Sequence, residues 1–378
     1  MERAPTALFH TSDLEAGRQM KFGLHFQLPC TPDQSPVQRY RDTIEQAAYA
    51  EALGFESVWP VEQHFNASLS IMPSPLLMLA AIAERTRSLR LGIAIVLLPL
   101  SHPLRVAEDV ATLDVISNGR VEFGIGRGGV PKHFKGFGVP IGENRDRFVE
   151  GIEIIRQAWT SDQFSYHGRF FDLERISVVP KPVQQPHPPI RVAANSEETF
   201  EHMGRMGLPI FAASQVNPFH RIKRFLATYH EARRAAGHRD ASPEDVSILM
   251  PLYVGSSAAQ VRREMEPSIK YFLSTATSLF GSGAPLPGAS RSSGSGSDAA
   301  ARLKQTLDRL ASMTYEQVCE RMAIFDTPEA CIERLQGYRE DFKMGRVICW
   351  FNPGGQVPHQ QVMRSMELFA ANVMPHFA

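Results

Sequence analysis

The alternation of strand-like and helix-like segments is the feature that most constrains the fold of this sequence. Eight apolar segments have the length and the β-branched and aromatic content of strands, and helix-like segments lie between them. Strands that alternate with helices form a parallel sheet, and eight such units favour closure into a (β/α)8 TIM barrel. A doubly wound open sheet is the structural alternative. The predicted strands are residues 20–28, 55–61, 89–100, 120–126, 188–195, 208–214, 246–255 and 345–352.

Prolines and glycines mark where the first helices begin and end. The pairs Ser35-Pro36 and Ser74-Pro75 supply an N-cap and a first-turn proline, and they predict helices that reach about residues 53 and 87. Two further helices are predicted over about residues 103–117 and 143–160. The segment 89–100, LRLGIAIVLLPL, is apolar almost throughout, which is typical of a strand that is buried on both faces.

Composition and charge exclude several classes of protein. Forty Lys and Arg residues balance forty Asp and Glu residues, so no net field attracts nucleic acid or a membrane surface. The sequence has no run of about 18 apolar residues, no signal-like start, and four scattered cysteines without metal-site spacing. We therefore expect a cytoplasmic protein without a metal site. Residues 1–19 are predicted to be a disordered extension, and residues 20–378 a single domain.

Polar side chains follow several predicted strands at the point where each strand ends. Glu62, Gln63 and His64 come directly after the second strand, in the segment VWPVEQHF. Barrels of this kind carry their catalytic groups at the C-terminal ends of the strands. The sequence therefore predicts a polar pocket at this rim. Further candidates for it are His25 and Gln27 on the first strand, His102 after the third, Arg127 after the fourth, Asn195 and Ser196 after the fifth, and Asn352 after the eighth.

The segment GIGRGG, residues 124–129, suits the binding of a phosphate group. Arg127 can donate charge-assisted hydrogen bonds to phosphate oxygens, and the glycines around it allow close approach of the backbone. Ser196 and Thr199 fall in the first turn of a predicted helix, where free N–H groups favour an anion. An internal ion pair, or plain helix capping, is the alternative for these residues. The glycine spacing does not match a dinucleotide-binding Rossmann motif.

Several longer segments resemble the bacterial luciferase-like flavin monooxygenases. They are VWPVEQHF, HPLRVAEDVATLDVISNGRVEFGIGRG, FGVP followed by ENRDRF, and RVAANSEETF, in the family's order over roughly residues 20–270. The resemblance implies a (β/α)8 barrel that uses reduced flavin mononucleotide (FMNH2) and molecular oxygen. It further implies a separate NAD(P)H:flavin reductase and the insertion of one oxygen atom into a small apolar organic substrate through a C4a-peroxyflavin. We also expect a homodimer.

The resemblance assigns residues to the flavin. It implies that Arg127 and Arg145 contact the FMN phosphate with Ser196 and Thr199, and that Asn195 replaces an acidic residue of luciferase. It also implies a non-proline cis peptide bond between Ala94 and Ile95 that braces the flavin ring. Gly126 stands where luciferase has a reactive cysteine, which opens space at that position.

The three polar residues after the second strand depart from the family's pattern. Family members often show Glu-His-His where this chain has Glu62-Gln63-His64. The first histidine is the proposed general base of luciferase, and Gln63 at that position cannot exchange a proton at neutral pH. Gln63 is expected to hydrogen-bond the substrate or the flavin peroxide. His64 keeps an ionisable group, which is either catalytic or structural and held by Glu62.

Residues 274–301, STATSLFGSGAPLPGASRSSGSGSDAAA, form a low-complexity segment that is rich in Gly, Ser and Pro. Such a composition does not support a packed core. We predict a mobile lid there, with a tolerated insertion as the alternative. Two other functions remain open at this point: a coenzyme F420-dependent oxidoreductase on the same barrel, and a flavin-binding subunit without catalysis.

Overall fold

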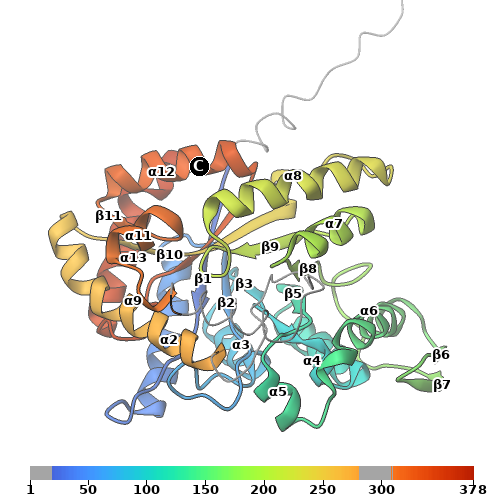
Figure 1. The fold of residues 1–378 in the computed structure, drawn as a ribbon. Coiled ribbons are helices and arrows are strands. Elements are labelled where there is room, and N and C mark those ends of the chain that lie inside the picture. Colours follow the sequence, from blue (N-terminus) through green and yellow to red (C-terminus); the bar gives the residue numbers. More distant parts are fainter. Residues whose placement is uncertain (1–18, 281–307, 309) are drawn as a thin grey trace, which may run out of the picture.

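Eight parallel strands close into a barrel in the computed structural model, which describes residues 19–280, 308 and 310–378. Strand β1 pairs with β2 on one side and with β12 on the other, and β12 continues the ring to β10. Figure 1 shows the helices around the outside of these strands. The predicted (β/α)8 barrel is confirmed. Its strands are β1 Lys21–Phe26, β2 Ser57–Pro60, β3 Arg90–Gly92, β5 Val121–Gly126, β8 Ile190–Ala193, β9 Ile210–Ala213, β10 Val246–Val254 and β12 Arg346–Trp350.

The helices begin close to the residues that the sequence indicates. Ser35 caps the first of them, with its side chain accepting a hydrogen bond from the backbone N–H of Gln38, and Gly54 follows its end at a φ of +87°. The larger helices are α2 Pro36–Ala52, α3 Pro75–Arg85, α4 Pro103–Ile116, α6 Asn144–Thr160, α7 Glu197–Met206, α8 Phe219–Ala235, α9 Ala258–Phe280, α12 Pro328–Phe342 and α13 His359–Asn372. Two short ones are α5 Pro131–Gly136 and α11 Tyr315–Arg321. No helix of the described residues is long and apolar enough to cross a membrane.

The prediction of one continuous strand over residues 89–100 is wrong at its centre. The segment divides into β3, the two-residue strand β4 Val96–Leu97, and a 3-10 turn over Leu98–Leu100. Ala94 still donates its N–H to Pro60 O of β2 at 3.0 Å, and the next paired residues, Val96 and Leu97, pair with β5. The peptide bond between Ala94 and Ile95 is cis, as the resemblance implies. An apolar pattern does not reveal this break, because both halves of the segment remain buried.

Three other elements differ from the sequence analysis. The hairpin β6 Phe164–His167 and β7 Asp172–Ile176, and the strand β11 Ile324–Asp326 beside β10, were not predicted. Residues 274–280, expected to be irregular, are the end of α9. The hydroxyl groups of Ser274 and Thr275 both donate to Tyr271 O, which lets polar residues fit a helix. The rest of the expected lid, residues 281–301, and the expected extension up to residue 18 lie outside the described residues.

Candidate functional site

An arginine and two hydroxyl groups meet at the C-terminal ends of β5 and β8, which are neighbours in the barrel. Arg127 follows β5 directly, and its Nη2 donates to Thr199 Oγ1 at 3.1 Å. Thr199 lies in the first turn of α7, and Ser196 is the N-cap of that helix, with its Oγ accepting from Thr199 N at 3.3 Å. The two hydroxyl oxygens are 2.9 Å apart. This cluster is called the α7 cradle below.

Positive charge concentrates at the α7 cradle. Burial lowers the pKa of Arg127, the carboxylate of Glu198 raises it, and the nearby charge of Arg145 lowers it. Arg145 itself is half-exposed and pairs with Glu198, with Nη1 and Oε1 2.6 Å apart. Burial also lowers the pKa of His202, and Arg145 and Arg127 add to that effect. Two guanidinium groups and the N-terminus of a ten-residue helix therefore converge at this place, where the first turn of α7 also carries the exposed carboxylates of Glu197 and Glu198.

The residues of the α7 cradle fit a flavin phosphate. Gly128 has a φ of +69°, and a side chain at Gly129 would meet open space, so the backbone turns there without filling the cradle. Next to it, the Nδ2 of Asn217 donates to the backbone carbonyl of Asn195 at 3.0 Å. In the part of the chain that the structure describes, the Oδ1 of Asn217 is buried without a partner. The turn thus suits an anion, whereas the Oδ1 of Asn217 is sealed from solvent.

The side chain of Ile95 packs against Gly126 at the end of β5. A side chain at Gly126 would collide with Ile95 Cδ1, so Ile95 occupies the space that the glycine leaves. The expectation that Gly126 opens free space is therefore wrong: the volume is taken by Ile95. The Ala94–Ile95 bond thus lies between the end of β2 and the cradle that follows β5.

A second polar network lies at the end of β2. Glu62 holds two groups: its Oε1 is 2.8 Å from His64 Nε2, and its Oε2 accepts from Leu97 N at 2.9 Å. The Nε2 of Gln63 is 3.1 Å from His133 Nε2. The rings of His64 and His133 meet edge to face with centroids 5.3 Å apart. The structure therefore brings together all three predicted residues of this loop, and it adds a histidine that the sequence analysis missed.

His133 is neutral at pH 7. Burial lowers its pKa to about 4, the charge of His64 contributes to the lowering, and a backbone hydrogen bond with His64 opposes it. A neutral ring carries one lone pair, so Nε2 can accept from the amide N–H of Gln63. Gln63 Oε1 is then the free end of that side chain. Nothing in the sequence segment PKHF, residues 131–134, marks His133 as a partner of Gln63, because α5 is only six residues long.

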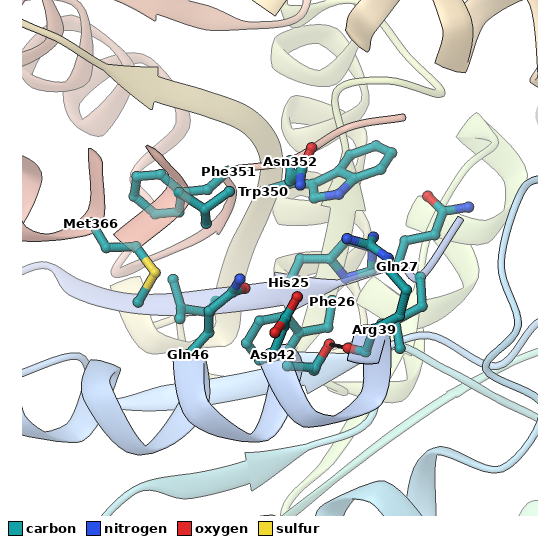
Figure 2. A pocket seen from close by; sticks show the side chains of 14 residues that line it. His25, Phe26, Gln27, Arg39, Asp42, Gln46, Trp350, Phe351, Asn352 and Met366 are labelled. Atoms are coloured by element: carbon teal, nitrogen blue, oxygen red, sulfur yellow. Dashed lines mark hydrogen bonds between the residues drawn. The ribbon is translucent and has the colours of Figure 1, made fainter. Parts of the chain in front are cut away.

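The remaining rim candidates divide into structural residues and one interior residue. His102 accepts from Leu104 N at 3.3 Å and caps α4, and Asn352 pairs with both backbone groups of Val357. These two residues order their loops. His25 is buried inside the barrel, with its Nδ1 2.9 Å from Trp59 O. Figure 2 shows His25 beside Trp350 at a small pocket that Gln27 also lines.

A group of possible metal ligands lies away from the rim network. Ligand atoms of Asp42, Glu45 and His359 are all within 4.8 Å of one another, between α2 and the start of α13. Gln46 Nε2 is 3.0 Å from His359 Nδ1, and the Nε2 of His359 faces Glu45 at 3.5 Å. Both ring nitrogens thus face protein groups, which an ordinary ion-pair cluster explains.

Comparison with known proteins gives matches along most of the chain. Residues 20–342 match the family model described as Luciferase-like monooxygenase. The chain is 30% identical over 263 residues to the flavin-dependent trigonelline monooxygenase, oxygenase component, of Acinetobacter baylyi, which covers 67% of this chain and 71% of that protein. It is 28% identical over 363 residues to the alkanal monooxygenase alpha chain of the Kryptophanaron alfredi symbiont, which covers 94% of this chain and 98% of that protein.

Solved structures share the fold over nearly the whole chain. Monooxygenase RslO1 from Streptomyces bottropensis has a TM-score of 0.78 at 28% identity and covers 95% of this chain and 100% of its own. The oxygenating constituent of 3,6-diketocamphane monooxygenase from Pseudomonas putida, in complex with FMN, has a TM-score of 0.78 at 20% identity, with 95% and 99% covered. An F420-dependent secondary alcohol dehydrogenase has a TM-score of 0.72 at 18% identity, with 95% and 99% covered. The last two similarities are of fold alone.

Proposed function

This chain belongs to the luciferase-like monooxygenase family, and we propose that it is an FMNH2-dependent monooxygenase that inserts one atom of molecular oxygen into a small apolar organic substrate. The activity resides in one barrel domain over residues 20–378. The observation that carries the proposal is the α7 cradle, where Arg127, Thr199 and Ser196 converge at the C-terminal rim of the barrel.

The α7 cradle would hold the FMN phosphate. Arg127 and Arg145 supply positive charge, Ser196 and Thr199 supply hydroxyl groups, and the free N–H groups of α7 point to the same place. The rest of the flavin would extend from there past Gly126, Ile95 and Ala94, with Asn195 at its edge. Reduced FMN, when bound, supplies the electrons that activate oxygen, and the protein supplies position and exclusion of water.

The network at the end of β2 would orient polar groups toward the reacting centre. Glu62 fixes the ring of His64 through a 2.8 Å contact and is itself fixed by Leu97 N. His133 fixes the amide of Gln63 so that Oε1 remains free to accept a hydrogen bond. In this arrangement Gln63 would accept a hydrogen bond from the substrate or the flavin without removing its proton. A proton could be exchanged by the imidazole of His64.

The electrons would come from a separate NAD(P)H:flavin reductase. The trigonelline relative is described as an oxygenase component, which names one part of a larger system. By analogy with it, this chain would receive FMNH2 from a partner protein and release FMN after each turnover.

Two alternative functions are distinguished from this one by the experiment described below. The fold is shared with an F420-dependent dehydrogenase, and the resemblance implies that Gln63 stands at the position of luciferase's proposed base. An F420-dependent enzyme would transfer hydride without oxygen, whereas a non-catalytic subunit would bind flavin and do nothing further.

The test combines anaerobic binding with isotope incorporation. The purified full chain is mixed separately with FMNH2 and with reduced F420, and binding is measured by equilibrium ultrafiltration. Oxidation of a panel of apolar organic compounds is then followed under ¹⁸O2 by mass spectrometry. The proposal predicts FMNH2 binding and a product with one ¹⁸O atom. Binding of F420 with an unlabelled product, or flavin binding without any product across the panel, would contradict it.

A further inference from the structure

Glu198 places a carboxylate at the α7 cradle, where the proposed function puts a phosphate group. Its Oε1 is 2.6 Å from Arg145 Nη1, and its negative charge raises the pKa of Arg127. The side chains of Glu198 and Arg145 are 62% and 55% exposed, so water screens their ion pair and the contact is weak. A phosphate dianion forms stronger, bidentate contacts with a guanidinium group. Phosphate can therefore displace Glu198 from Arg145.

His202 lies beside Glu198 and the α7 cradle on the same helix. It follows Thr199 by three residues and Glu198 by four, and residues at these spacings are neighbours on one helix face. His202 is partly buried, and charged groups from three parts of the barrel rim act on it. These groups are Arg127 after β5, Arg145 from α6, and Glu198 and Arg205 from α7. The imidazole is thus within electrostatic reach of the phosphate position.

The imidazole of His202 is neutral at pH 7. Burial is the main cause that lowers its pKa, the three guanidinium groups lower it further, and the carboxylate of Glu198 opposes them. Two ion pairs engage other charges of α7, which are Arg205 with Glu201, and Glu197 with Arg224 of α8. Glu198 itself is held by Arg145. Release of Glu198 from Arg145 would therefore favour a proton on His202.

We propose that the binding of a phosphate group at the α7 cradle is coupled to the uptake of a proton by His202. The phosphate takes Arg145 from Glu198, and the released carboxylate turns to His202, one helical turn further along α7. A proton from solvent adds to the imidazole, and the imidazolium pairs with Glu198 beside the bound dianion. The inference deepens the proposed function and rests on it, because the phosphate is taken to be that of FMN.

The coupling makes the affinity for the phosphate depend on pH. Because the bound state holds a proton that the ligand-free state lacks, affinity rises as the pH falls toward the ordinary histidine pKa of 6.5. FMN would thus bind more tightly in slightly acidic solution and leave more readily in slightly basic solution.

The first test follows the titration of His202 directly. NMR spectra of the full chain with ¹⁵N-labelled histidine are recorded against pH, alone and with oxidised FMN, riboflavin or inorganic phosphate. The His202 resonance is identified by its loss in His202→Gln. FMN and inorganic phosphate should move its midpoint from below 6.5 to above it, and riboflavin, which has no phosphate, should leave it unchanged. A midpoint that FMN and phosphate do not move, or that riboflavin moves equally, overturns the proposal.

The second test measures FMN affinity by calorimetry from about pH 8 to about pH 6. The phosphate of FMN titrates in the same range, so the unmodified protein is compared with His202→Gln, in which that contribution is the same. The ratio of the two affinities should change roughly two- to tenfold in favour of the unmodified protein as the pH falls. His220→Gln, at an exposed histidine of α8, is the control and should behave as the unmodified protein does. A constant ratio for His202→Gln overturns the proposal.

Two neighbouring carboxylates give a matched pair of variants for the displacement step. Glu198→Gln removes the competitor for Arg145, so it should bind FMN roughly two- to fivefold more tightly at pH 8 and should reduce the shift of the His202 midpoint. Glu197→Gln alters a carboxylate that faces Arg224 instead, and should do neither. Equal effects of the two substitutions on FMN affinity and on the His202 midpoint overturn the proposal.

Failure of the proposed function is distinguishable in the same spectra. If FMN does not bind to the unmodified protein but inorganic phosphate moves the His202 midpoint, the proposed function is contradicted and the coupling stands. If FMN binds and the His202 midpoint does not move, this inference alone is contradicted.

Discussion

At the scale of single residues, the unusual position is Gln63. An amide stands where luciferase places its proposed base, and the structure puts the imidazole of His133 3.1 Å from that amide. The imidazole is held neutral by burial, with a pKa of about 4. The amide N–H of Gln63 therefore donates to the neutral ring of His133, and a substitution of Gln63 should alter the protonation of His133.

Gln63→Glu should raise the pKa of His133. The new carboxylate has no hydrogen to donate, so it favours a proton on His133 Nε2 and attracts the resulting positive charge. The midpoint of His133, followed by NMR against pH, should move from about 4 to above the ordinary histidine value of 6.5. The His133 resonance is assigned with His133→Asn. A midpoint that stays near 4 would show that Gln63 and His133 are not hydrogen-bonded as described.

At the scale of elements, the N-terminus of α7 serves both the fold and the cradle. Ser196 caps the helix, and its Oγ also faces Thr199 Oγ1. Ser35 caps α2 in the same way, with its Oγ 3.3 Å from Gln38 N, but it has no contact with the cradle. The two serines therefore form a matched pair in which only one should affect ligand binding.

Ser196→Ala and Ser35→Ala should each lower the free energy of unfolding by about 1 kcal/mol through loss of a cap. Only Ser196→Ala should also weaken FMN binding, because it removes a hydroxyl group from the phosphate position. Urea unfolding and FMN titration of both variants give the comparison. Equal FMN affinities in the two variants would remove Ser196 from the cradle.

The sequence predicts elements better than it predicts contacts between them. All eight barrel strands follow from local apolar content, and Ser35 and Gly54 mark the ends of α2, because these signals are local. The segment from β3 to β4 is held by contacts of Ala94 N with Pro60 O and of Leu97 N with Glu62, whose partners are more than 30 residues apart along the chain. The pairing of Gln63 with His133 spans 70 residues. Such contacts exist only after the barrel has closed, and no local pattern contains them.

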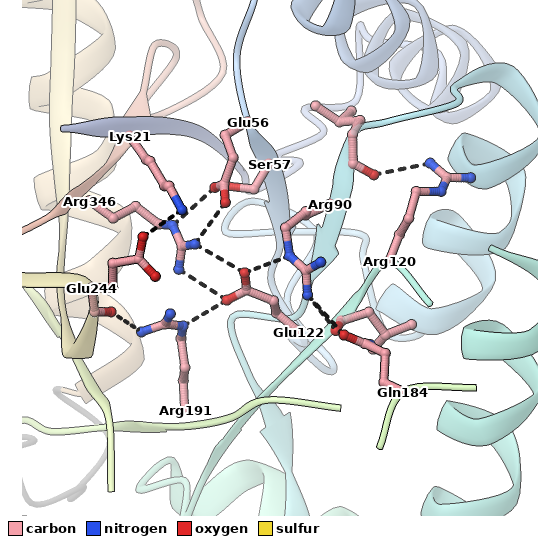
Figure 3. Close-up of polar contacts among 12 residues, drawn as sticks. Lys21, Glu56, Ser57, Arg90, Arg120, Glu122, Gln184, Arg191, Glu244 and Arg346 are labelled. Carbon is pink, nitrogen blue, oxygen red and sulfur yellow. Dashed lines mark hydrogen bonds and ion pairs between the residues drawn. The ribbon is translucent and has the colours of Figure 1, made fainter. Parts of the chain in front are cut away.

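At the scale of the whole molecule, buried charges close the end of the barrel opposite the site. Figure 3 shows Arg90, Arg191 and Arg346 converging on Glu122, which is buried. Burial alone would raise the pKa of Glu122, but the three guanidinium groups hold it well below its usual range. This contribution to stability is present above the ordinary pKa of 4.5 and is lost as the pH falls below it.

His25 should make stability depend on pH in a different window. Burial lowers its pKa to about 4 in the folded chain, against the ordinary histidine value of 6.5 in the unfolded chain. Between these values the unfolded chain binds a proton that the folded chain does not, so stability is full above about pH 6.5 and falls as the pH decreases toward 4. The loss is roughly 3 kcal/mol for this residue. In urea unfolding between pH 7 and pH 5, the free energy of unfolding should fall less steeply with decreasing pH in His25→Gln than in the unmodified protein. An equal pH dependence in the two proteins would mean that His25 titrates normally.

The central claim is that the α7 cradle binds the phosphate of FMN, and a comparison of FMN with riboflavin tests it most directly. Riboflavin has the same ring system and lacks the phosphate. The unmodified protein should bind FMN more tightly than riboflavin, and Arg127→Ala should weaken FMN binding roughly tenfold or more because a charge-assisted hydrogen bond is lost. Arg145→Ala should act in the same direction, and Arg105→Ala, at an exposed arginine that pairs with Glu108, serves as the control. Riboflavin affinity should not change in any variant. Equal affinities for FMN and riboflavin, or an unchanged FMN affinity in both cradle variants, would contradict the account.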